Sequence, residues 1–145
     1  SDRDGLEFFD EHYALHEIIP SRLWIGNVGD ARDVRSILNL GVEAVIDLAC
    51  NELPVKVPRD IVYLRLPIVD GTGNPPQLLQ LAVETTAHLI ASGMPTFVFC
   101  SAGVSRSPAI VAAAIATAEH SSLDDTLKRI GAMVPHDVLP GYGTS

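Results

Sequence analysis

The residues best suited to chemistry in this 145-residue chain lie between positions 97 and 108. Cys100 follows the apolar run Phe97–Phe99, which predicts a buried strand. Arg106 comes six residues later, and Ser107-Pro108 then opens an apolar segment that predicts a helix, with Pro108 at its first position. A strand, a short loop and a helix start together direct backbone N–H groups at one point. The pattern therefore predicts an anion-binding loop that carries a cysteine.

The residue types in this loop suit the transfer of a phosphoryl group. Loop amides and the positive end of the following helix favour a thiolate at Cys100, and the thiolate is the reactive form of cysteine. Arg106 offers a planar pair of donors for two phosphate oxygens, and the Ser107 hydroxyl can donate to the sulfur as it leaves an intermediate. The predicted phosphate-binding residues are Ser101, Ala102, Gly103, Val104, Ser105 and Arg106. This set predicts phosphoryl transfer through a cysteinyl phosphate.

Such a reaction also needs an acid that protonates the leaving oxygen, and Asp70 is the candidate. It lies in the Gly-rich stretch of residues 66–74, after the apolar run of residues 61–66. Asp70 and Cys100 each follow a predicted strand, and the carboxyl ends of parallel strands meet at one edge of a sheet. The topology alone therefore predicts that the two side chains share that edge.

Two segments of the chain resemble a known family, the cysteine-based dual-specificity protein phosphatases of the protein tyrosine phosphatase superfamily. CSAGVSRSP (residues 100–108) resembles their Cys-x5-Arg loop, and LPIVDGTGN (residues 66–74) resembles their general-acid loop. SRLWIGNVGDARD and GVEAVIDLA resemble their first strands, so the resemblance covers about residues 18–135. It implies the family's fold and metal-independent hydrolysis of phosphomonoesters, without a cofactor. It also implies that Cys100 is the nucleophile and Arg106 the transition-state ligand. Asp70 is then the general acid, and Ser107 assists hydrolysis.

The chain departs from this family at Phe99, where the family has a histidine that orders the loop and tunes the nucleophile. The leading hypothesis is an enzyme that dephosphorylates phosphotyrosine in proteins, alone or together with phosphoserine and phosphothreonine. A phosphate-binding interaction module without turnover is the second; Phe99 favours it, whereas the intact Cys100, Arg106 and Asp70 disfavour it. A cysteine-loop sulfurtransferase or reductase is the third, and it would not need Asp70.

Strands that alternate with helices predict an α/β fold, a single domain with a mostly parallel central sheet flanked by helices. The phosphate-binding loop would then join a strand to a helix. Apolar runs predict strands over residues 22–26, 43–49, 61–66 and 97–99. Caps and helical periodicity predict helices over residues 30–39, 75–91, 108–118 and 122–131, the first of them capped by Asp30.

The domain limits follow from composition. Residues 1–17 carry six acidic residues and one arginine, which predicts a solvated acidic extension or a short surface helix. Residues 18–135 form the predicted phosphatase-like catalytic domain, and residues 136–145 form an irregular tail. His12 and His16 stand one helical turn apart but have no third ligand nearby in the sequence, so no metal site is predicted.

The net charge of −8 argues against nucleic acid and anionic membrane surfaces as partners. Two cysteines are too few for a disulfide framework, which fits a reducing compartment. No apolar run approaches the roughly 20 residues of a membrane span. We expect a cytoplasmic monomer whose partner is a phosphorylated protein or a small phosphomonoester.

Cys50 also follows the end of a predicted strand. One interpretation is a small buried apolar residue. The other is a redox partner that traps oxidised Cys100 as a disulfide. Some lipid phosphatases of the superfamily are similar in having a cysteine just after the equivalent strand.

Overall fold

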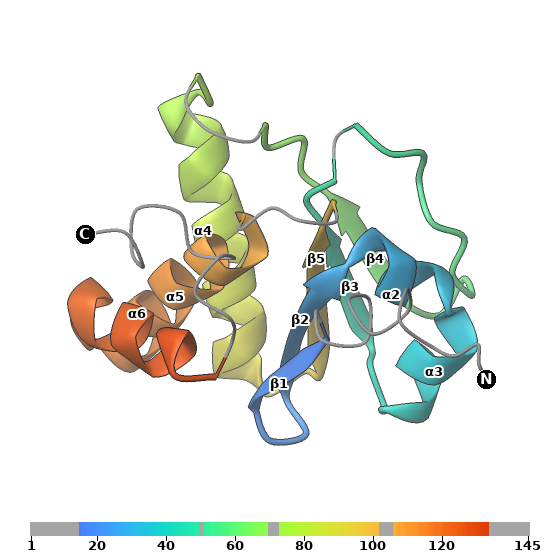
Figure 1. Cartoon of the computed structure of the whole chain (residues 1–145), viewed down its shortest axis with the longest axis horizontal. Helices are drawn as coiled ribbons and strands as arrows, with labels where there is room; N and C mark the ends of the chain where they lie inside the picture. Colours follow the sequence, from blue (N-terminus) through green and yellow to red (C-terminus); the bar gives the residue numbers. More distant parts are fainter. Residues whose placement is uncertain (1–14, 50, 70–72, 102–105, 134–145) are drawn as a thin grey trace, which may run out of the picture.

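Five strands form one sheet in the order β1-β2-β5-β3-β4 (Figure 1). The computed structural model describes residues 15–49, 51–69, 73–101 and 106–133. β2, β5, β3 and β4 run parallel, and β1 pairs antiparallel with β2 at one edge. The strands are β1 (His16–Ile19), β2 (Leu23–Asn27), β3 (Ala44–Asp47), β4 (Val62–Arg65) and β5 (Thr96–Cys100). The predicted α/β fold with a mostly parallel sheet is confirmed.

Helices cover both faces of the sheet (Figure 1). One face carries α4 (Pro76–Ser92), α5 (Arg106–Glu119) and α6 (Leu123–Gly131). The other carries the short helices α2 (Val28–Arg32) and α3 (Val34–Asn39). Each predicted strand, and each predicted helix after residue 70, lies within two residues of an observed element at both ends.

The central strand β5 is buried on both sides, and its side chains alternate between the two layers. Val98 and Cys100 belong to the core beneath α4, α5 and α6. Phe97 and Phe99 belong to the core beneath α2 and α3, where their rings stack with centroids 5.7 Å apart. Phe99 therefore packs on the opposite side of the sheet from Cys100, fully buried among apolar residues.

The helix predicted over residues 30–39 is two helices, and its first cap is not Asp30. Asn27 caps α2 by accepting a hydrogen bond from Asp30 N, while the Asp30 carboxylate accepts one from Asn27 N, each over 2.9 Å. This reciprocal pair is a capping box, with Asp30 as its third helical residue. Asp33 then leaves the helical region at φ −85° and ψ 71° and caps α3 through Ser36. A second capping residue in the middle of the segment breaks it in two.

Two further boundaries differ from expectation. α5 begins at Arg106 rather than Pro108, so Pro108 lies in the first turn, where a missing N–H still removes no helical bond. His16 and Glu17, predicted within the acidic extension, belong to β1, which pairs with Ile25 and Trp24 of β2. Residues 1–14 lie outside the described part of the chain.

Candidate active site

The carboxyl ends of the four parallel strands meet at one edge of the sheet, as the topology predicted. Cys100 at the end of β5 stands in register with Asn27 at the end of β2. On its other side Phe99 stands in register with Asp47 at the end of β3, and Asp47 with Arg65 at the end of β4. Cys100, Asp47 and Arg65 therefore lie along this edge.

Cys100 is buried, with 2% of its surface exposed, and Ser107 lies against it. The Ser107 hydroxyl, in the first turn of α5, donates to Cys100 Sγ over 2.9 Å. It also lies 3.4 Å from the carbonyl oxygen of Gly26, near the end of β2. β5 leads toward this point and α5 leads away from it, which is why residues seven apart come into contact.

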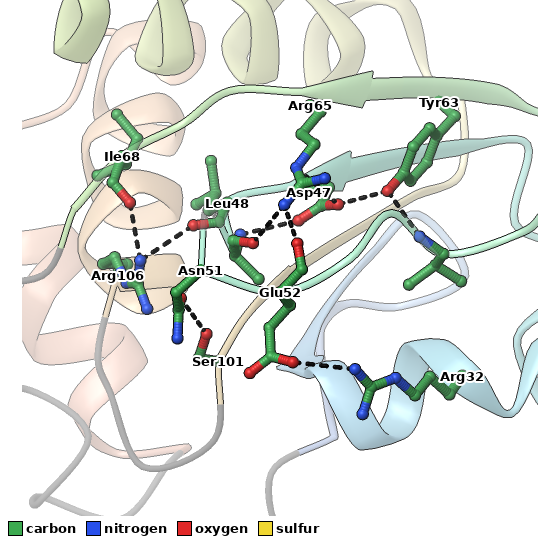
Figure 2. A network of polar contacts seen from close by, with 12 residues as sticks. Arg32, Asp47, Leu48, Asn51, Glu52, Tyr63, Arg65, Ile68, Ser101 and Arg106 are labelled. Carbon is green, nitrogen blue, oxygen red and sulfur yellow. Dashed lines mark hydrogen bonds and ion pairs between the residues drawn. The ribbon is translucent and has the colours of Figure 1, made fainter.

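Arg106 is 8% exposed and lies beside the segments that follow β3 and β4 (Figure 2). Its Nη1 donates to the carbonyl oxygens of Leu48, after β3, at 3.2 Å and of Ile68, after β4, at 2.7 Å. Its Nε is also buried but has no hydrogen-bond partner among the described residues. A buried N–H without a partner costs about 1–3 kcal/mol. A guanidinium fixed at Nη1, with Nε still to be satisfied, suits an anion such as a phosphate oxygen.

Ser101 is the second predicted phosphate-loop residue that the structure describes, and it is 7% exposed. Its hydroxyl donates to Oδ1 of Asn51 over 2.7 Å. Asn51 lies in the segment after β3 that also supplies the Leu48 carbonyl to Arg106. Ala102, Gly103, Val104 and Ser105 lie outside the described residues.

A buried carboxylate organises the segment after β3 (Figure 2). Asp47, 1% exposed, accepts hydrogen bonds from the Tyr63 hydroxyl and from Ala49 N, the latter over 2.8 Å. Arg65 Nε lies 3.6 Å from the same carboxylate. Burial and, second, the hydrogen bond to Asp47 raise the pKa of Tyr63 to about 12. The hydroxyl therefore stays protonated and serves as a donor to Asp47 at neutral pH.

The predicted general acid Asp70 lies outside the described residues, but the structure describes the chain on either side of it. Ile68 accepts from Arg106. Val69 N donates to Asn74 Oδ1 over 2.7 Å, and Asn74 Nδ2 donates to the Val69 carbonyl over 2.8 Å. The Asn74 side chain thus holds both backbone groups of the residue before Asp70.

Cys50, the predicted redox partner, also lies outside the described residues. In the part of the chain that is described, no three His, Cys, Asp or Glu side chains gather as a group that could hold a metal ion. Within the same residues, no helix has the length and apolar character needed to cross a membrane.

Four residues near this edge were not predicted from the sequence: Asp47, Asn51, Arg65 and Asn74. A signal existed for two of them. Asp47 and Arg65 each follow an apolar run within a predicted strand, and opposite charges on adjacent strands can pair. Asn51 and Asn74 are polar residues in loops, and nothing in their spacing distinguishes them from other loop asparagines.

Comparison with known proteins agrees with this geometry. A sequence profile of the family "Dual specificity phosphatase, catalytic domain" matches residues 23–136. Dual specificity protein phosphatase 15 of Homo sapiens is 31% identical over 114 residues, covering 78% of this chain and 38% of the relative. The chain therefore belongs to the dual specificity phosphatase family. It spans between 29 and 38% of the length of the first three curated relatives it matches.

Solved structures share the fold. A mouse putative dual specificity phosphatase complexed with zinc tungstate superposes with a TM-score of 0.75 at 20% identity, covering 90% of this chain and 81% of that one. A human tyrosine phosphatase-like serine/threonine/tyrosine-interacting protein superposes with a TM-score of 0.71 at 22% identity, covering 89% of each chain. The predicted family and fold are both confirmed.

Proposed function

We propose that this chain hydrolyses phosphomonoesters through a cysteinyl-phosphate intermediate and acts on phosphotyrosine in proteins, with phosphoserine and phosphothreonine as further substrates. The observation that carries the proposal is the buried Arg106, whose Nε lacks a partner among the described residues, next to a Cys100–Ser107 hydrogen bond at the same sheet edge. Membership of a phosphatase family supports it.

In the first step the Cys100 thiolate attacks phosphorus, and the bond from phosphorus to the leaving oxygen breaks. Asp70 gives its proton to that oxygen, so the product leaves as a neutral alcohol or phenol. Arg106 and the loop amides hold the three equatorial oxygens, on which negative charge spreads in the transition state. The phosphate is then attached to Cys100.

In the second step water attacks the phosphorus, and the Asp70 carboxylate takes its proton. The phosphorus–sulfur bond breaks, and the electron pair returns to sulfur as a thiolate. The Ser107 hydroxyl, already 2.9 Å from Sγ, donates to that developing charge. Inorganic phosphate leaves, and the resting enzyme is restored. A reducing compartment such as the cytoplasm keeps the thiol of Cys100 available for this cycle.

The substrate class is inferred from charge. The five residues between Cys100 and Arg106 are uncharged, and the chain carries a net charge of −8. Substrates that bear several phosphates would be repelled unless a local basic patch offset this charge. A single phosphate on a protein side chain is the substrate that this composition favours.

The test is hydrolysis of an aryl phosphate with excess chelator, for the wild-type chain, Cys100→Ser and Arg106→Met. We expect chelator-resistant turnover by the wild type alone and a covalent phosphoenzyme that can be trapped on Cys100. Turnover that survives in Cys100→Ser would refute the cysteinyl-phosphate mechanism.

A second candidate is a phosphate-binding module without turnover. Phe99 favours it, because the family has a histidine here that orders the loop, whereas the buried phenyl ring of Phe99 has no hydrogen-bonding group. The similarity to a protein described as a phosphatase-like interacting protein is compatible with it. Absence of turnover at any pH, with phosphate still bound through Arg106, would establish this alternative. Family membership disfavours the sulfurtransferase or reductase hypothesis.

A further inference from the structure

The segment that follows β3, described at residues 48, 49, 51 and 52, lies between the candidate catalytic residues and a network of charged side chains (Figure 2). On the catalytic side it makes three contacts with the β5–α5 region. Leu48 N donates to the Phe99 carbonyl over 2.9 Å, and the Leu48 carbonyl accepts from Arg106. Oδ1 of Asn51 accepts from the Ser101 hydroxyl over 2.7 Å.

On its other side the same segment is held by Asp47 and Arg65. Arg65 Nη2 donates to the carbonyl oxygens of Ala49, over 3.0 Å, and of Glu52. Asp47 Oδ1 accepts from Ala49 N. The turn is closed by Glu52 N donating to the Ala49 carbonyl over 3.0 Å. One guanidinium and one buried carboxylate therefore hold the backbone groups of Ala49 and Glu52, which flank Asn51 at a distance of two residues and one.

A surface ion pair extends this support to α2. Arg32 Nη2 donates to Glu52 Oε1 over 2.9 Å. Exposed pairs of this kind contribute little to stability, about 0–1 kcal/mol. The main restraint on the turn is accordingly the Asp47–Arg65 pair, because Asp47 is buried and each of its partners replaces lost hydration.

We propose that Asn51 is a positioning residue for the phosphate-binding loop, acting through Ser101. Ser101 directly follows Cys100, so its orientation sets the direction in which the chain leaves β5. The turn fixed by Arg65 presents the Asn51 amide oxygen to the Ser101 hydroxyl, and this bond holds the first loop residue in place before phosphate arrives. The proposal rests on the proposed use of this loop to bind phosphate.

The expected effect follows from preorganisation. Donors that stabilise a transition state are effective when they are fixed before the reaction, and small displacements reduce the rate. Loss of one neutral hydrogen bond corresponds to about a tenfold change in an equilibrium or rate constant. Asn51 is exposed, so its replacement leaves no cavity in the core.

The experiment is a double-mutant cycle with Asn51→Ala, Ser101→Ala and the double variant. Three quantities are measured for each protein: kcat/KM for an aryl phosphate, the dissociation constant for tungstate, and the thermal unfolding temperature. Asn39→Ala, an exposed asparagine at the end of α3, is the matched control. We expect each single variant to lose about tenfold in kcat/KM and in tungstate affinity, and the double variant to lose no more than either. The unfolding temperature of Asn51→Ala and the activity of Asn39→Ala are expected to match the wild type.

Several outcomes would overturn the proposal. Additive losses, about a hundredfold in the double variant, would show that Asn51 does not act through Ser101. Unchanged tungstate affinity in Asn51→Ala would show that the bond does not position the loop. Tungstate binding also separates this proposal from the proposed function, because a wild-type chain that binds tungstate without turnover refutes only the enzymatic activity. A wild-type chain that binds no tungstate refutes both.

Discussion

The Ser107 hydroxyl donates to Sγ of Cys100 over 2.9 Å, linking the first turn of α5 to the last residue of β5. Both residues are buried, Ser107 at 1% exposed and Cys100 at 2%. In the absence of bulk water, a hydrogen bond to a charged sulfur is stronger than the same bond at the surface. The contact therefore matters most in the states in which sulfur is anionic.

Replacing Ser107 by alanine is expected to slow the breakdown of the phosphoenzyme. The sulfur leaves as a thiolate in that step, and without the hydroxyl it loses a bond worth roughly 10- to 100-fold in rate. Pre-steady-state release of an aryl alcohol is then expected to show a burst followed by slow turnover. Ser92→Ala, which removes a hydroxyl bonded to Leu89 within α4, is the control. Equal slowing of burst and turnover would contradict the assignment.

Replacing Asn74 by alanine is expected to impair protonation of the leaving group. The substitution frees both backbone groups of Val69, which directly precedes Asp70. Esters with poor leaving groups depend most on a positioned acid, so kcat/KM is expected to fall at least about tenfold for phenyl phosphate and less for a nitrophenyl ester. Asp70→Asn is expected to show a larger difference between the two esters in the loss of kcat/KM. An equal loss for both esters would show that Asn74 acts elsewhere.

Replacing Tyr63 by phenylalanine is expected to lower stability by about 1–3 kcal/mol at neutral pH, because buried Asp47 loses a donor. The pKa of Tyr63 rises from 10.0 to about 12 in the folded chain. Between pH 10 and about 12 the Tyr63 hydroxyl is ionised in the unfolded chain but still protonated in the folded chain. Its contribution to the free energy of unfolding is therefore full below pH 10 and is lost as pH rises to about 12. The free energies of unfolding of the wild type and Tyr63→Phe, measured in urea, are therefore expected to converge over that pH range. A constant difference would refute the role of the Tyr63 hydroxyl.

Peroxide is expected to inactivate the chain reversibly if Cys50 traps oxidised Cys100. Peroxide converts the Cys100 thiolate to a sulfenic acid, and attack by Cys50 forms a disulfide and releases water. Asn51, which follows Cys50 in the chain, accepts a hydrogen bond from Ser101, which follows Cys100. Recovery of activity after a dithiol reductant is the measurement, and Cys50→Ser is expected to lose it. Unchanged recovery in that variant would refute the redox role and support the other interpretation, in which Cys50 is a small apolar residue.

Features that are determined by short stretches of sequence could be predicted. Apolar runs located β2 to β5, because strands that contribute side chains to a core are rich in apolar residues. The order of strands and helices was enough to place Cys100 at a sheet edge with the other strand ends. The helix predicted over residues 122–131 is α6, which Ser122 caps by accepting a hydrogen bond from Asp125 N.

Features that depend on distant partners could not be predicted in this way. The bond from Ser101 to Asn51 joins residues 50 apart, and no periodicity relates them. β1 is short and polar at Glu17, so only its pairing with β2 identifies it as a strand. The break between α2 and α3 depends on Asp33 taking a non-helical conformation, which its residue type permits but does not require.

Arg106 bonds to carbonyl groups 58 and 38 residues earlier in the chain, and Ser107 approaches one 81 residues earlier. Closing loops of such length costs chain entropy before any contact compensates for it, which slows folding. During refolding, the ability to bind an oxyanion is accordingly expected to return with the last cooperative phase, after helical content has recovered. A fragment that begins after β2 would keep Cys100 and Arg106 but lack the strand that pairs with β5 and whose Gly26 carbonyl lies near Ser107.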